Sequence, residues 1–142
     1  TRLVTLLDPD DTISRPSHLP ADHHLILPML DISDPGVRHA PSLDQVAALL
    51  DWGRSLGPGN RVLFHCFGGL CRSPAAALAL LAQALGPGRD GDALDILMRA
   101  YPLSMPNRLI IQHADALLNR NGALASYVRS SKRSIALGDL TD

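Results

Sequence analysis

Apolar and polar positions alternate in blocks along the chain, and the short apolar blocks predict β-strands. Each block spans five to seven residues and contains leucine with isoleucine or valine, and a loop follows it. The predicted strands occupy residues 3–7, 24–30 and 61–65. Pro28 places the second strand near a sheet edge or at a bulge, because proline cannot donate to a strand ladder. Residues 8–22 and 31–41 are polar and contain proline, and we expect loops there.

Longer segments with helical spacing follow these strands. Ser42 and Gln45 form a capping-box pattern at the start of a helix that ends before Gly57. Pro74 lies in the first turn of an alanine- and leucine-rich helix over residues 73–85, where proline is tolerated. Further helices are predicted over residues 90–101, 106–121 and 123–137. Strands that alternate with helices predict an α/β fold with a mostly parallel sheet flanked by helices.

Length and composition narrow the classes of function. The chain of 142 residues suits a single domain over residues 1–142, and we expect further sequence before Thr1, which lies in an apolar run. A formal charge of −1 argues against nucleic-acid binding. No apolar run approaches the ~18 residues of a membrane span, and no secretory leader opens the chain. Two closely spaced cysteines indicate chemistry rather than a disulfide framework, so we expect a cytoplasmic protein.

The segment between the third strand and the helix that follows it carries the chemistry. It runs His65-Cys66-Phe67-Gly68-Gly69-Leu70-Cys71-Arg72-Ser73. A phosphate dianion needs inward-pointing N–H groups, a helix N-terminus and a bidentate cation. The backbone of residues 67–72, the helix that begins near Ser73 and the guanidinium of Arg72 supply all three. We therefore expect a phosphate-binding loop made by Phe67, Gly68, Gly69, Leu70, Cys71 and Arg72.

Cys66 stands at the base of this loop, directly after a buried strand. The N–H groups and helix dipole that hold a phosphate would also stabilise a thiolate and lower the pKa of Cys66. The hypothesis is nucleophilic catalysis through a phosphocysteine. The Ser73 hydroxyl would donate to the sulfur as it leaves, and His65 would hold the loop through hydrogen bonds rather than transfer protons.

These residues resemble the signature of the protein tyrosine phosphatase superfamily: His-Cys, five residues, then Arg-Ser. The chain looks like the small bacterial tyrosine or dual-specificity phosphatases from about Leu3 to Leu124, most sharply from Val62 to Leu81. The resemblance implies a sheet of four to five strands and hydrolysis of phosphorylated proteins or small phosphomonoesters. It implies no cofactor and no metal. The histidines follow no zinc-ligand spacing.

The resemblance also implies a general acid, an aspartate on a loop some thirty-odd residues before the cysteine. Asp34 lies 32 positions before Cys66 and Asp31 lies 35 before it, both on the loop that follows the second strand. Asp34 is the better spaced and is our first choice. Asp31 remains a rival, because no Trp-Pro-Asp motif fixes the choice.

Two other interpretations and one further hypothesis remain open. A phosphate-binding pseudophosphatase would capture phosphoproteins without turnover, and a rhodanese-like sulfurtransferase also uses a loop cysteine. The loop is also similar to that of low-molecular-weight tyrosine phosphatases, which carry a second cysteine just before the arginine. Cys71 occupies that position here. The hypothesis is that Cys71 traps oxidised Cys66 as a reversible disulfide, and the alternative is that it only fills space.

Overall fold

The structure, a computed structural model, describes the backbone of residues 1–139 and the side chains of residues 1–131. Short strands and longer helices alternate along the first half of this described part, and helices alone form the second half. The elements are β1 (Arg2–Thr5), the 3-10 turn η1 (Ala21–His23), β2 (His24–Ile26), α1 (Leu43–Arg54), β3 (Val62–His65), α2 (Arg72–Leu85), α3 (Asp90–Ala100), α4 (Arg108–Leu117) and α5 (Ala123–Asp139).

The strands form one parallel sheet in the order β2-β1-β3. Over the described residues the sheet has three strands, so the expectation of four to five strands is wrong. The chain carries three short apolar runs of strand type, and its other apolar positions are used by helices at helical spacing. The predicted α/β class and the parallel pairing are confirmed.

The pairing of β2 with β1 continues beyond the bounds of β2, as the length of the predicted strand suggested. Leu27 N–H donates to Thr5 C=O and Met29 N–H donates to Leu7 C=O, each over 2.8 Å. Pro28 lies between these two donors, at a position that faces away from β1. Because β2 is an edge strand, the missing N–H of Pro28 costs no hydrogen bond in the sheet.

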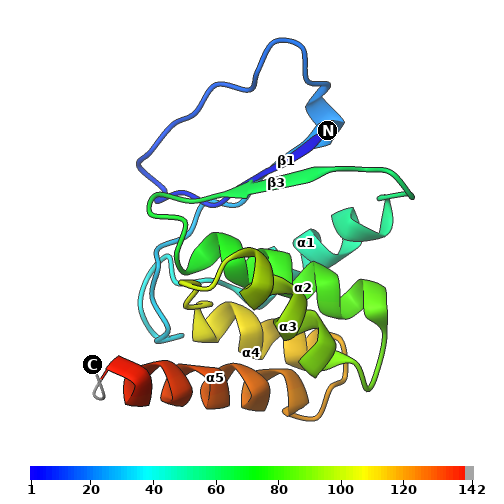
Figure 1. The fold of residues 1–142 in the computed structure, drawn as a ribbon. Coiled ribbons are helices and arrows are strands. Elements are labelled where there is room, and N and C mark those ends of the chain that lie inside the picture. Colours follow the sequence, from blue (N-terminus) through cyan, green and yellow to red (C-terminus); the bar gives the residue numbers. More distant parts are fainter. Residues whose placement is uncertain (140–142) are drawn as a thin grey trace.

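The helices cover one face of the sheet (Figure 1). Val4 is fully buried on this face, and Leu25 and Phe64 pack beside it against the same core. The central helix α2 packs against β3, α1, α3 and α4, while α5 packs against α3 and α4. Small side chains let α2 approach its neighbours closely, since Ala75, Ala76, Ala79 and Ala82 are all completely buried.

The opposite face of the sheet is covered only by the chain that links β1 to β2, which arches over it in Figure 1. Leu63 and Ile26 consequently remain 61% and 48% exposed. Thr5 also lies off the helical core but is fully buried, because two histidines enclose it.

Local sequence signals place most helix ends close to the prediction, but α4 (Arg108–Leu117) is shorter than the helix predicted over residues 106–121. Ser42 Oγ accepts from Gln45 N–H and Gln45 Oε1 accepts from Ser42 N–H, which completes the predicted capping box of α1. The last predicted helix, residues 123–137, is present as α5, and residues 140–142 lie outside the described part. No helix of the described residues is both long and apolar enough to cross a membrane.

Candidate active site

The loop from Cys66 to Cys71 joins the carboxyl end of β3 to the N-terminus of α2, and it folds back on the sulfur of Cys66. Gly69 has a φ of 69°, a left-handed conformation that side chains disfavour. This turn aims Gly69 N–H at Cys66 Sγ over 3.2 Å, and Ser73 Oγ lies 3.2 Å from the same sulfur. Two polar groups, one from the loop and one from the first turn of α2, therefore face the sulfur.

Two opposing effects act on the pKa of Cys66. Burial raises the pKa, whereas hydrogen bonds from the Ser73 hydroxyl and from the Ser73 and Gly69 amides lower it, as does the positive charge of Arg72. The stabilising groups win, and the pKa of Cys66 falls below that of an ordinary thiol. A thiolate is the nucleophilic form of cysteine, so this environment favours attack on an electrophile.

Arg72 is the first residue of α2, and its side chain is only 7% exposed. Its Nη1 donates to Asp8 Oδ1 over 2.6 Å and to the Met29 carbonyl over 2.8 Å. Its Nε is buried without a hydrogen-bond partner. A buried donor without a partner is costly, and an oxyanion beside the guanidinium would satisfy it.

Asp8 is a residue of the site that the sequence analysis missed. It follows β1, and it therefore lies at the same carboxyl edge of the parallel sheet as Cys66. Its position directly after a predicted strand could have indicated this role, because side chains that follow neighbouring parallel strands meet at the same edge of the sheet. Asp8 fixes the charged end of Arg72 from outside the Cys66–Cys71 loop.

A hollow of about 220 Å³ opens over the loop. Its lining consists of one aspartate, the candidate nucleophile and five residues of the predicted phosphate-binding loop: Asp31, Cys66, Phe67, Gly68, Leu70, Cys71 and Arg72. The nucleophile candidate, the guanidinium and a carboxylate thus share one small cavity.

Asn107 fixes the carboxylate of Asp31. Its Nδ2 donates to Asp31 Oδ1 over 2.8 Å and to Ile32 C=O over 3.2 Å, while its Oδ1 caps the N-terminus of α4. Its own N–H donates to Cys71 C=O over 3.0 Å. The residue whose side chain caps α4 therefore also ties the loop of Asp31 to the loop of Cys66.

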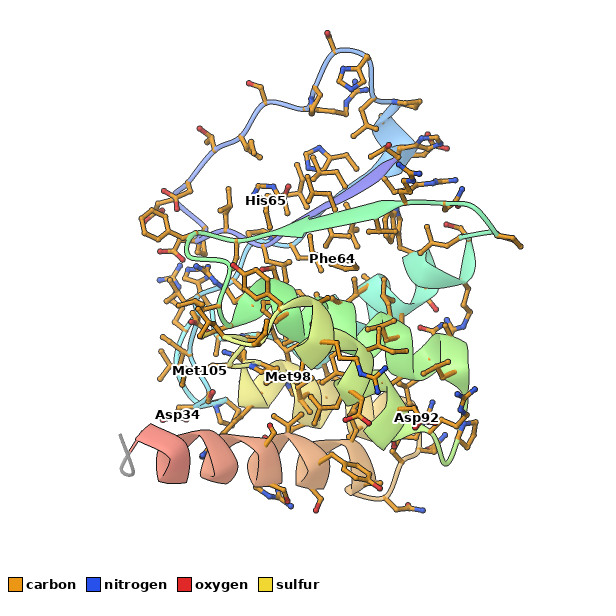
Figure 2. All side chains as sticks on the ribbon, in the orientation of Figure 1. Asp34, Phe64, His65, Asp92, Met98 and Met105 are labelled. Carbon is orange, nitrogen blue, oxygen red and sulfur yellow. The ribbon has the colours of Figure 1, made fainter. Side chains whose placement is uncertain are left out.

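Asp34, our first choice for the acid, occupies a different environment. Its Oδ1 accepts from Gly36 N–H over 2.9 Å, which makes it the first residue of a local turn. Both aspartates are exposed. Asp34 is absent from the lining of the hollow. Figure 2 shows it well away from His65, the last residue of β3. Of the two candidate aspartates, Asp31 is the one that the fold brings to the cysteine.

His65 is held below the loop by a buried hydroxyl. Its Nε2 lies 2.5 Å from Thr5 Oγ1, and His24 Nε2 lies 2.7 Å from the same oxygen. A hydroxyl has one proton and can donate to only one of these nitrogens, so the other imidazole must donate to the hydroxyl. The three side chains join all three strands just before Cys66. The sequence predicted a loop-holding role for His65 but did not identify its partner.

Clusters of three or more metal-ligating side chains are absent from the described residues. The four histidines of residues 18–39 are accordingly not gathered into a site within that part of the chain.

Comparison with known proteins identifies a similar fold but no related sequence family. Neither the family models nor the curated proteins include a match to this chain. Among solved structures, the fold is similar to that in the crystal structure of Tk-PTP in the active form, a protein tyrosine phosphatase, with a TM-score of 0.53 and 24% sequence identity. The match covers 84% of this chain and 79% of that one. The chain therefore has a fold of the protein tyrosine phosphatase type.

Proposed function

We propose that this protein is a phosphomonoester hydrolase of the tyrosine or dual-specificity class, with Cys66 as its nucleophile. The observation that carries the proposal is the surrounding of Cys66 Sγ by the Ser73 hydroxyl and the Gly69 amide at the N-terminus of α2. The phosphatase-type fold supports it, because that fold places the loop at the carboxyl edge of the sheet.

In the first step the Cys66 thiolate attacks phosphorus. The bond from phosphorus to the leaving oxygen breaks, and its electron pair stays on that oxygen. The loop amides and Arg72, with its unpartnered Nε, stabilise the charge on the equatorial oxygens. Donors that are held in position before the reaction would need no reorganisation in the transition state.

Asp31 is our proposed general acid, with Asp34 as the less favoured candidate. A proton from the Asp31 carboxyl neutralises the leaving alkoxide or phenoxide. Asn107 occupies one oxygen of this group, Oδ1, which leaves Oδ2 for the substrate. The same group, now a carboxylate, accepts a proton from water as the water attacks phosphocysteine. The sulfur–phosphorus bond breaks, Ser73 donates to the departing thiolate, and inorganic phosphate is released.

The substrates that we propose are phosphorylated proteins or small phosphomonoesters. The test is turnover of para-nitrophenyl phosphate by the purified protein and by Cys66→Ser. We expect turnover by the wild type, none by the variant, and a phosphocysteine at Cys66 in acid-quenched samples examined by mass spectrometry.

The two other interpretations make different predictions in the same experiment. Binding of phosphate without turnover by the wild type would identify a pseudophosphatase. Transfer of sulfur from thiosulfate to cyanide would identify a sulfurtransferase. Either result would overturn the proposed hydrolase.

A further inference from the structure

Large apolar side chains are exposed in the loop of Cys66 and in the turn that follows α3. Phe67 follows the nucleophile directly and is 88% exposed, and Leu103 is 76% exposed. Leu70 and Met105 are 41% and 48% exposed. The chain has only two phenylalanines, and the other, Phe64, packs against the core. A group of exposed apolar side chains, unlike a single one, is typical of a contact surface.

These four side chains come from two segments that are joined to each other. Met105 N–H donates to Leu70 C=O over 2.7 Å, which holds the turn after α3 against the loop of Cys66. Ser104, between Leu103 and Met105, is 1% exposed and donates to Tyr101 C=O, so the turn is anchored. Figure 2 shows Met105 at the end of the molecule where β3 passes into α2. Phe67 and Leu70 also line the hollow itself.

Few charged groups line the hollow itself. Of the residues that line the hollow in the described part of the chain, Arg72 is the single cation, and its Nη1 is already held by Asp8. A substrate with several phosphates, or an anionic membrane, would need additional basic groups at the rim. The surface instead suits a substrate with one phosphate and apolar neighbours.

We propose that Phe67, Leu70, Leu103 and Met105 form an apolar docking surface for the apolar side chains that flank the phosphorylated residue of a protein substrate. The inference rests on the proposed hydrolase activity and adds a specificity to it. A phosphate seated in the hollow brings the adjoining polypeptide across these four side chains. Burial of apolar surface on both partners then favours segments with leucine, methionine or phenylalanine beside the phosphorylated residue.

The test uses three phosphotyrosyl peptides that differ only in the residues next to the phosphotyrosine, which are leucine, serine or glutamate. We expect the wild type to show a kcat/KM about tenfold higher for the leucine peptide than for the serine peptide, equivalent to about 1.4 kcal/mol. In Leu103→Ser this ratio should fall toward one, while turnover of para-nitrophenyl phosphate stays unchanged. Ile96→Ser, which alters an exposed apolar residue of α3, is the matched control and should keep the wild-type ratio.

The outcomes separate this inference from the hydrolase proposal. Equal kcat/KM for the leucine and serine peptides, or an unchanged ratio in a Leu103→Ser and Met105→Ser double variant, would overturn the docking surface alone. Absence of para-nitrophenyl phosphate turnover would overturn the hydrolase, and the docking surface would then be judged by the affinities of Cys66→Ser for the same peptides. Binding of the wild type to phosphatidylserine vesicles that Leu103→Ser abolishes would assign the surface to a membrane instead.

Discussion

Arg72 and Asp8, which lie 64 positions apart in the sequence, form an ion pair with a distance of 2.6 Å between Nη1 and Oδ1. The arginine is almost completely buried, whereas the aspartate is 46% exposed. The pair directs one end of the guanidinium toward β1, and Nε remains without a partner. Asp8 thus acts as a positioning residue for the cation of the site.

The first prediction follows from this pair. Asp8→Asn should lower kcat/KM for para-nitrophenyl phosphate by about tenfold or more, because a carboxylate holds a guanidinium better than a neutral amide. Most of the loss should appear as a higher KM, because an Arg72 side chain that is no longer held in one position binds phosphate more weakly. Asp10→Asn, which changes an exposed carboxylate on the same loop, is the control and should match the wild type. Equal kinetics for the two variants would exclude a positioning role for Asp8.

The second prediction concerns Ser73 and the pKa of Cys66. The Ser73 hydroxyl contributes to the lowered pKa of Cys66, so Ser73→Ala should raise that pKa. The acid limb of the kcat/KM profile, and the ultraviolet titration of the thiolate, should both move to higher pH. Ser55→Ala, at the far end of α1, is the control. An unmoved thiolate titration in Ser73→Ala would show that the hydroxyl does not act on the sulfur.

The same shift has a consequence for stability. The pKa of Cys66 is lower in the folded chain than in the unfolded chain, so between the two values the folded state binds fewer protons. Stability from this group is therefore complete above the unfolded pKa and is lost as the pH falls through the folded pKa. Cys66→Ser should remove this part of the pH dependence in urea unfolding curves.

The third prediction decides between the two aspartates. Asp31→Asn should lower turnover of phenyl phosphate by about 100-fold or more, because an unprotonated leaving group departs slowly. The loss should be much smaller for a substrate with a good leaving group, and the basic limb of the pH–rate profile should flatten. Asp34→Asn is the matched variant on the same loop and should retain activity. The reverse pattern would make Asp34 the general acid.

The parts of the fold that the sequence predicted are those encoded by neighbouring residues. Ser42 and Gln45, for example, cap α1 within one turn. The number of strands was wrong because it came from the family resemblance, whereas the chain itself shows three apolar runs of strand length.

In the site, too, contacts between residues close in the sequence could be predicted, and contacts between distant residues could not. Cys66, Gly69 and Ser73 lie within eight residues, so the sequence alone indicated that they act together. Asp8 meets Arg72, Thr5 meets His65 and Asn107 meets Asp31 across separations of 64, 60 and 76 positions. No local pattern encodes such pairs. The choice of Asp31 depends on one of them, which is why spacing alone favoured Asp34.

The fourth prediction concerns the hydroxyl between the two histidines. Thr5→Val keeps the shape and β-branching of the side chain but leaves two imidazole nitrogens against a methyl group. We expect a loss of about 1–3 kcal/mol in the free energy of unfolding, measured in urea, because buried polar groups lose their partner. Thr5→Ser keeps the hydroxyl and should lose less. Equal stability of the valine and serine variants would show that the hydrogen bonds contribute nothing.

The fifth prediction concerns Cys71 and oxidation. Neither Cys66 nor Cys71 forms a disulfide in the structure, and both line the same hollow. Peroxide oxidises a thiolate to a sulfenic acid and releases hydroxide, and the Cys71 thiol can then form a disulfide with Cys66 and release water. Asn107 N–H and Ala75 N–H both hold the Cys71 carbonyl, so we expect the Cys66 end of the loop to move when the bridge forms. A disulfide would block the nucleophile but protect it from irreversible oxidation.

The experiment compares the wild type with Cys71→Ser after peroxide treatment and then dithiothreitol. The wild type should recover most of its activity, since a disulfide is reducible. Cys71→Ser should recover much less, because its sulfenic acid proceeds to sulfinic acid, which dithiothreitol cannot reduce. Mass spectrometry should detect a bridge between residues 66 and 71 in the oxidised wild type. If both proteins recover equally and this bridge is absent, Cys71 contributes to packing and has no redox role.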